Sequence, residues 1–185
     1  MKINKTLKIT YNSVFIVITL LLGYLGRLSI LPVFPFLKLD FSDVPVFLAT
    51  IISGTPSGVI VLLVSSSFRT LMFSSAGWSG FAIRLTSLIV VLFIGIFCKY
   101  KNKFLKISGI VFGAVICLCV KLVINYFLWI NLFFISPEVL NRFMFPVIIP
   151  YNILKLIITI GMAFYFEKPT KKLLKISENS FNKWL

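Results

Sequence analysis

The most constraining feature of this chain is its long apolar stretches without any charged residue. Val44 to Phe68 contains 25 residues with no acidic or basic side chain, and Ile9 to Gly26 is a second such stretch. Of all residues, 59% are hydrophobic and 13% are charged, whereas about a quarter of a soluble domain is charged. A water-soluble fold could not bury this much apolar surface, so the sequence predicts an all-α integral membrane protein.

Breaks between the apolar stretches predict six transmembrane helices in one domain, residues 1–185. They are separated by the loop at 27–43, by turn-forming sequence at 54–58 and 74–80, by a basic segment at 99–106 and by Ser136-Pro-Glu138. The expected helices cover about 9–26, 43–54, 57–73, 80–98, 107–130 and 143–166, and a tail follows at 167–185. The first helix resembles a signal peptide, but no small-residue cleavage site follows it, so we expect it to be retained.

The distribution of basic residues predicts the orientation in the membrane. The net charge is +14, and with six spans the N-terminus, the segment 99–106 and the tail lie on one side. That side carries twelve lysines, which predicts cytoplasmic ends in a bacterial plasma membrane. The other side carries Arg27, Lys38 and Arg142 with the acids Asp40, Asp43 and Glu138. A nucleic-acid-binding protein would instead gather its lysines on one soluble face.

No pattern in the sequence indicates catalysis, a metal or a cofactor. The chain has no histidine, and its three cysteines all fall in apolar runs, which does not make a metal site. It has no phosphate-binding loop for ATP and no Ser/His/Asp set. All five acids lie in loops, at helix ends or in the tail, so no carboxylate is expected at mid-membrane depth. We therefore expect a protein that is not an enzyme.

Two lysines near the middle of expected helices are the clearest functional candidates. A charge there costs on the order of 2.5–3.5 kcal/mol on insertion scales. Asn125 follows Lys121 by four residues and Asn152 precedes Lys155 by three, so each pair shares one helix face. Because these two helices run in opposite directions, the four residues line one outward-facing pocket if the helices pack together. Asparagine both donates and accepts hydrogen bonds, which suits the amide edge of a heterocycle or a polyol.

A structural explanation of the two lysines stays open. Pro146 and Pro150 free backbone carbonyl groups that could satisfy Lys155. Lys121 could pair with an acid from a loop or with water. Under this explanation the lysines hold helices together and bind no ligand.

Four further residues each have two possible roles, at the membrane interface or at the binding site. Trp78 and Phe81 either belong to an aromatic belt at the membrane interface or stack on a planar ligand. Arg69 and Arg84 either anchor their helices at the interface or line the mouth of the site.

Three segments resemble the riboflavin-specific S components of energy-coupling factor (ECF) vitamin transporters, the RibU type. They are Leu39-Asp-Phe-Ser-Asp-Val-Pro45, Ile124-Asn-Tyr-Phe127 and Pro150-Tyr-Asn-Ile-Leu-Lys155. The resemblance implies six helices, and riboflavin or a related flavin bound near the outer face beneath the first loop, which includes Asp40. It implies that Asn125, Asn152 and Lys155 contact the ligand. As partners it implies a transmembrane T protein and two cytoplasmic ATPases that drive inward release.

The sequence departs from this family in three places. The first helix lacks the pair of alanine-type residues, four apart, that docks to the T protein. Ile83-Arg84 stands where an asparagine-containing segment is expected, and Ser65-Ser-Ser67 replaces a Lys-Asn-like stretch. Because Arg84 and Lys121 suit a more anionic ligand, an S component for a different vitamin is one alternative. A structural or assembly membrane protein without a small ligand is the other.

Overall fold

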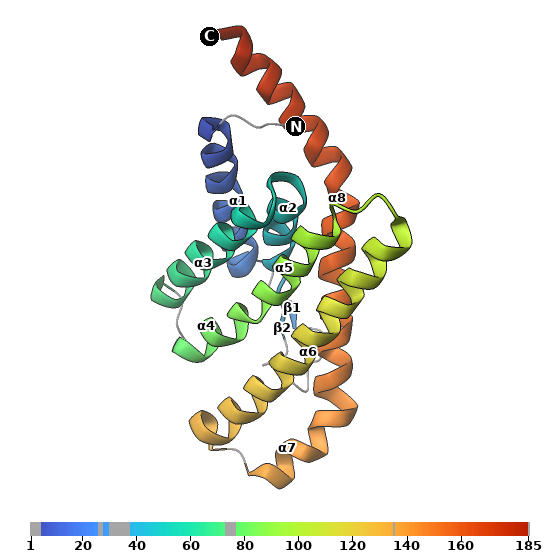
Figure 1. Ribbon diagram of the computed structural model, residues 1–185. Helices are drawn as coiled ribbons and strands as arrows, with labels where there is room; N and C mark the ends of the chain where they lie inside the picture. The colour runs from blue at the N-terminus through green and yellow to red at the C-terminus, as the bar shows by residue number, and fades with distance from the viewer. Residues whose placement is uncertain (1–4, 26–27, 30–37, 73–76, 135, 185) are drawn as a thin grey trace.

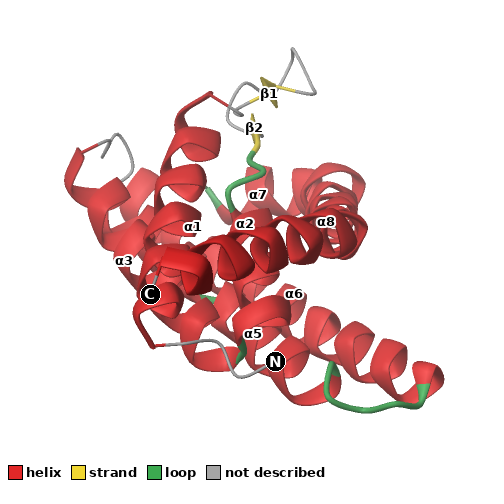
Figure 2. Ribbon diagram, turned by 90° about the horizontal axis from the view of Figure 1, so that it is seen from above, coloured by secondary structure: helices red, strands yellow, loops and turns green. Residues whose placement is uncertain are grey.

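The fold is a bundle of helices, which confirms the predicted class (Figure 1). The computed structural model describes residues 5–25, 28–29, 38–72, 77–134 and 136–184. Its helices are α1 (Lys5–Leu25), α2 (Asp43–Ser53), α3 (Thr55–Met72), α4 (Gly77–Leu85), α5 (Ser87–Phe97), α6 (Lys103–Phe133), α7 (Pro137–Phe143), the π-helical turn η1 (Met144–Ile148) and α8 (Ile149–Trp184). Strands β1 (Leu28–Ser29) and β2 (Lys38–Leu39) pair antiparallel, and Figure 2 shows them at the edge of the bundle, away from α5 and α6.

One helix is too short to cross a membrane by itself. Within the described residues, five helical segments are long and apolar enough to span: Thr6–Leu25, Thr55–Met72, Trp78–Phe97, Lys103–Asn131 and Pro137–Leu174. The sixth, α2, has 11 residues and rises about 16 Å, whereas the hydrocarbon core is about 30 Å thick. The N-terminal end of α2 therefore lies within the thickness of the membrane.

A tight turn joins α2 to α3. Gly54 adopts a φ of 89° and its N–H donates to the Thr50 carbonyl at 3.0 Å. A side chain is strained at this φ, which explains the glycine. The break predicted at 54–58 thus falls at its first residue.

The short helix α2 forms the centre of the bundle. Every residue from Asp43 to Thr50 is buried, and α2 packs against α1, α3, α5 and α8. Burial on all sides fits the unbroken apolar run from Val44 to Ala49.

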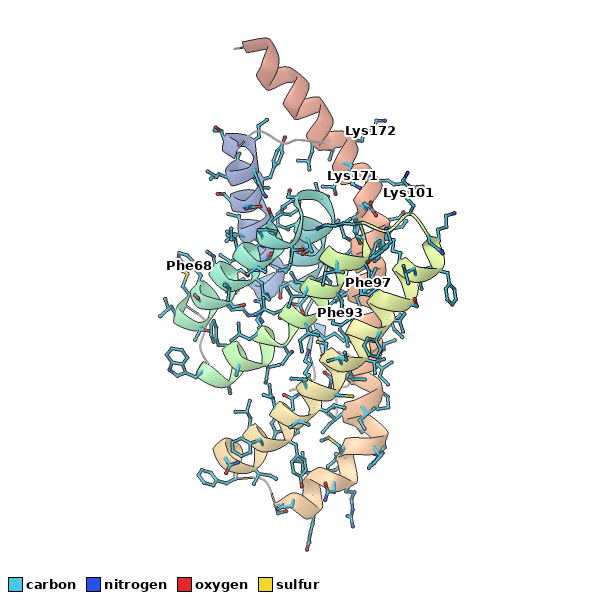
Figure 3. The ribbon with its side chains drawn as sticks, in the orientation of Figure 1. Phe68, Phe93, Phe97, Lys101, Lys171 and Lys172 are labelled. Carbon is cyan, nitrogen blue, oxygen red and sulfur yellow. The ribbon has the colours of Figure 1, made fainter. Side chains whose placement is uncertain are left out.

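Small residues allow α5 and α6 to approach closely. Gly109 and Gly113 of α6 face the rings of Phe97 and Phe93, and an added Cβ at either glycine would overlap a ring. The rings stack on each other with centroids 5.9 Å apart, and Figure 3 shows them between the two helices. Such small-residue contacts are the usual basis of helix packing in lipid.

Several helices extend further than the sequence indicated. Helix α6 begins at Lys103 within the basic segment, because the Asn102 side chain caps it by accepting from the Phe104 N–H at 3.0 Å. The expected tail continues α8 as helix to Trp184. Two predicted helices are interrupted, one at Thr86 between α4 and α5 and one at the π-helical turn before α8.

The basic segments lie at one end of the bundle. The start of α1, the turn between α5 and α6 and the end of α8 are together in Figure 1, whereas α7 is at the opposite end. Lys101, Lys171 and Lys172 mark the basic end in Figure 3. This arrangement agrees with the predicted six spans, and the positive-inside rule makes the basic end cytoplasmic.

Candidate functional site

Six charged side chains from five segments gather at the N-terminal end of α2. We call this group the charged cluster: Asp40, Asp43, Arg69, Arg84, Lys121 and Lys155. Two ion pairs organise it, Arg69 of α3 with Asp40 at 2.6 Å and Arg84 of α4 with Asp43 at 3.6 Å. Lys121 of α6 and Lys155 of α8 are close enough for their charges to act on one another and on Asp40.

Asp40 fixes the segment that leads into α2. One of its carboxylate oxygens accepts the Ser42 N–H at 2.9 Å, and Arg69 donates both to Asp40 and to the Ser42 hydroxyl, the latter at 3.0 Å. Burial opposes ionisation of this carboxyl, but the nearby charges of Lys155 and Arg69 and the bonds to Ser42 outweigh it. The pKa of Asp40 is therefore lowered to about 2, so the group is a carboxylate at neutral pH.

Asp43 is the first residue of α2 and is only 8% exposed. Its carboxylate lies at the positive end of the helix dipole, and it accepts a hydrogen bond from the Ser87 hydroxyl at 3.4 Å. Arg84 and Ser87 stand on either side of the break at Thr86. The break thus allows two side chains from successive helices to meet one carboxylate.

The expectation that no carboxylate reaches this depth is wrong. Asp40 and Asp43 precede an apolar helix, but that helix is too short to start at the membrane surface, so both acids lie inside the bundle. The alternative in which an acid from a loop balances Lys121 agrees better with the structure, because the charge of Asp43 acts on that of Lys121. Even so, among the described residues neither Lys121 nor Lys155 lies within 4.0 Å of a carboxylate.

The structure brings the two predicted lysines close enough for their charges to act on one another. Lys121 is 7% exposed and Asn152 is 5% exposed, while Asn125 and Lys155 are partly buried. The Asn152 amide donates to the Ile148 carbonyl in the π-helical turn at 2.8 Å. This bond uses one donor of Asn152 and leaves its oxygen as an acceptor at the site. That these four residues contact a ligand stays a prediction.

The aromatic candidates lie further out. Trp78 is 80% exposed and meets Phe81 edge to face, with ring centroids 6.1 Å apart. Phe81 is partly buried, one turn before Arg84 on α4. The structure therefore places Phe81 near the charged cluster and leaves Trp78 on the outer surface, as an interfacial aromatic would be.

Sequence reasoning gave too little weight to Arg69, Arg84 and Asp43. Charged residues inside otherwise apolar helices usually face a polar interior, and this signal was present for both arginines. Their partners could not be found from the sequence, because no spacing rule relates them to a carboxylate 29 or 41 residues away along the chain.

The profile of the family described as "ECF transporter, substrate-specific component" matches residues 7–165. The chain is an S component of an ECF transporter. S components are transport proteins, not enzymes, and are multi-pass proteins of the bacterial cell membrane. They bind a substrate and work together with a T component and ATPases.

Individual relatives agree with this family. The riboflavin transporter RibU of Streptococcus thermophilus is 28% identical over 182 residues, covering 91% of this S component and 85% of the relative. The riboflavin transporter RibU of Staphylococcus aureus is 30% identical over 152 residues, covering 77% and 79%. A solved structure of the S component of a bacterial ECF transporter superposes with a TM-score of 0.74 at 27% identity, covering 93% of this chain and 99% of the other.

Proposed function

We propose that this S component binds riboflavin or a closely related flavin from the outer side of the membrane. In this proposal a T component and two ATPase subunits then drive delivery of the flavin to the cytoplasm. Two relatives carry the name riboflavin transporter. The chain itself has no ATP-binding loop, so partner subunits must supply the energy.

The observation that supports the proposal is that Lys121 of α6 and Lys155 of α8, each of which shares a helix face with an asparagine, lie close enough for their charges to act on one another. The flavin ring system has an edge on which carbonyl oxygens alternate with nitrogen atoms. Asn125 and Asn152 can each donate to and accept from such an edge, and the Lys155 ammonium can donate to a carbonyl oxygen. Because these groups lie in a largely buried region, their hydrogen bonds to a ligand are stronger than in water.

We propose that the first loop, residues 27–43, covers the bound flavin, with Phe81 packing beside it. Residues 27 and 30–37 of this loop lie outside the described residues. The end of this loop is held by the Asp40–Arg69 ion pair, which fixes the segment next to the site.

Binding can be measured by quenching of riboflavin fluorescence in detergent, with wild type compared to Lys155→Ala. Wild type should quench and should melt at a higher temperature with riboflavin, since a ligand at 100 times its Kd adds about 2.7 kcal/mol of stability. Lys155→Ala should fold and lose both effects. Lys168→Ala, which changes an exposed lysine of α8 on the cytoplasmic side of the bundle, is the control and should keep both.

The outcome separates the alternatives. A wild-type protein that folds but neither quenches riboflavin fluorescence nor gains stability contradicts the flavin proposal and favours another vitamin. If Lys155→Ala instead fails to fold while riboflavin has no effect on wild type, Lys155 holds helices together and the assembly-protein alternative gains support.

A further inference from the structure

The charged cluster contains more positive than negative charge. Among the described residues it has four cations, Arg69, Arg84, Lys121 and Lys155, and two carboxylates, Asp40 and Asp43. Each carboxylate already has an arginine within ion-pair distance. The cluster therefore has two positive charges in excess, both on lysines.

Lys121 is the more deeply buried of the two lysines. Its side chain is 7% exposed, and the nearest helical turn on its own face presents Cys117, whose thiol donates to the Thr86 carbonyl at 3.3 Å. Its surroundings include a second cation, Lys155, as well as Asp43 and Asp40. A buried ammonium group is costly unless it is paired and hydrogen-bonded, and no described carboxylate is within 4.0 Å of this one.

A neutral ligand would not balance this charge. Carbonyl and hydroxyl oxygens of an uncharged flavin offer hydrogen bonds to Lys155 and the two asparagines, but they leave the excess in place. An anionic group would neutralise part of it and would form a charge-assisted hydrogen bond with the Lys121 ammonium. The Asp43 and Arg84 pair beside Lys121 is already neutral as a unit, so it would not repel such a group.

We propose that the substrate carries an anionic group and that Lys121 is the residue which selects it. This inference rests on the proposed function and deepens it: the ring system meets Asn152 and Lys155 on α8, and a phosphate on the side chain of the flavin meets Lys121 on α6. Lys121 is then a specificity-determining residue, distinct from those that hold the ring.

The test compares two probes, riboflavin and riboflavin 5′-phosphate, titrated into detergent-purified protein by fluorescence quenching. Wild type should bind the phosphate ester about tenfold or more tightly than riboflavin, as expected for a charged hydrogen bond. In Lys121→Gln the ratio of the two affinities should fall to about one, and this ratio is the readout whatever the change in riboflavin affinity itself. Lys121→Arg should keep the preference.

The control variant is Lys106→Gln, which removes one positive charge from the same helix near its cytoplasmic end, where Lys106 lies over the Phe164 ring at 5.0 Å. It should keep the full preference for the phosphate ester. If Lys106→Gln loses the preference as well, general attraction to a basic protein is the cause and the assignment to Lys121 fails.

Riboflavin binding also reports that each variant is folded. Wild type that binds riboflavin as tightly as its phosphate ester, or more tightly, overturns the anion inference and leaves the proposed function intact. A preference that persists in Lys121→Gln overturns the role of Lys121. Wild type that binds neither flavin overturns the proposed function and the inference with it.

Discussion

Asp43→Asn should be one of the most damaging single changes near the site. The substitution keeps the size of the side chain but removes one of two carboxylates from a cluster with four cations. At 3.6 Å from Arg84, with both side chains close to nine-tenths buried, the Coulomb attraction is about 4–5 kcal/mol at an effective dielectric of about 20. Removing one partner of a buried pair typically costs about 3–5 kcal/mol, so we expect a loss of about that size.

The assay is reversible unfolding of detergent-purified protein, monitored by helical circular dichroism. The matched control is Glu167→Gln, which breaks the Lys171–Glu167 pair in the more exposed part of α8. Such a pair contributes under about 1 kcal/mol. The double variant Asp43→Asn with Arg84→Gln should recover part of the loss, because it removes the uncompensated buried charge together with its partner.

Two results would refute this reasoning. If Asp43→Asn loses no more stability than Glu167→Gln, the carboxylate does not hold the cluster together. If the double variant is as unstable as the sum of its two single variants, Asp43 and Arg84 act independently and their ion pair is not the cause.

Three further predictions follow from the same structure. The pKa of Asp40 is about 2, below its usual 3.8, so the stability that its carboxylate contributes is complete above about pH 4 and is lost as the pH falls toward 2. Between pH 4 and pH 2 the melting temperature of Asp40→Asn should therefore fall less than that of wild type. Gly113→Leu would overlap Phe93 and should cost about 1–3 kcal/mol, whereas Gly161→Ala, with no neighbour within 4 Å of its added Cβ, should be neutral or stabilising in the same melts. Trp78→Ala should change riboflavin affinity by less than about twofold in a titration, as other surface changes do, and a larger loss would place Trp78 at the ligand.

Features that depend on one-dimensional patterning were accessible from the sequence. Lipid imposes long apolar segments and sided lysines, so the helices, the break at Gly54 and the common end of the basic segments could be predicted. The shared faces of Lys121 with Asn125 and Lys155 with Asn152 follow from helical spacing alone.

The depth of α2 could not be predicted in the same way. The sequence predicts a short helix at 43–54 but does not show that the N-terminal end of this helix lies inside the bundle. Asp43 begins that short helix and Asp40 lies just before it, and both meet arginines from α3 and α4 inside the bundle. Pairings between distant segments depend on packing that local sequence does not encode, which is why both carboxylates were assigned to the surface.

The central claim is that a flavin occupies the Lys/Asn site beside α2. The most direct measurement is the visible absorption spectrum of protein purified in detergent after incubation with riboflavin and removal of free ligand. Wild type should retain the yellow flavin bands at up to one flavin per chain, and Lys155→Ala should be colourless. A folded wild-type protein that emerges colourless, or a Lys155→Ala protein as yellow as wild type, would contradict the account.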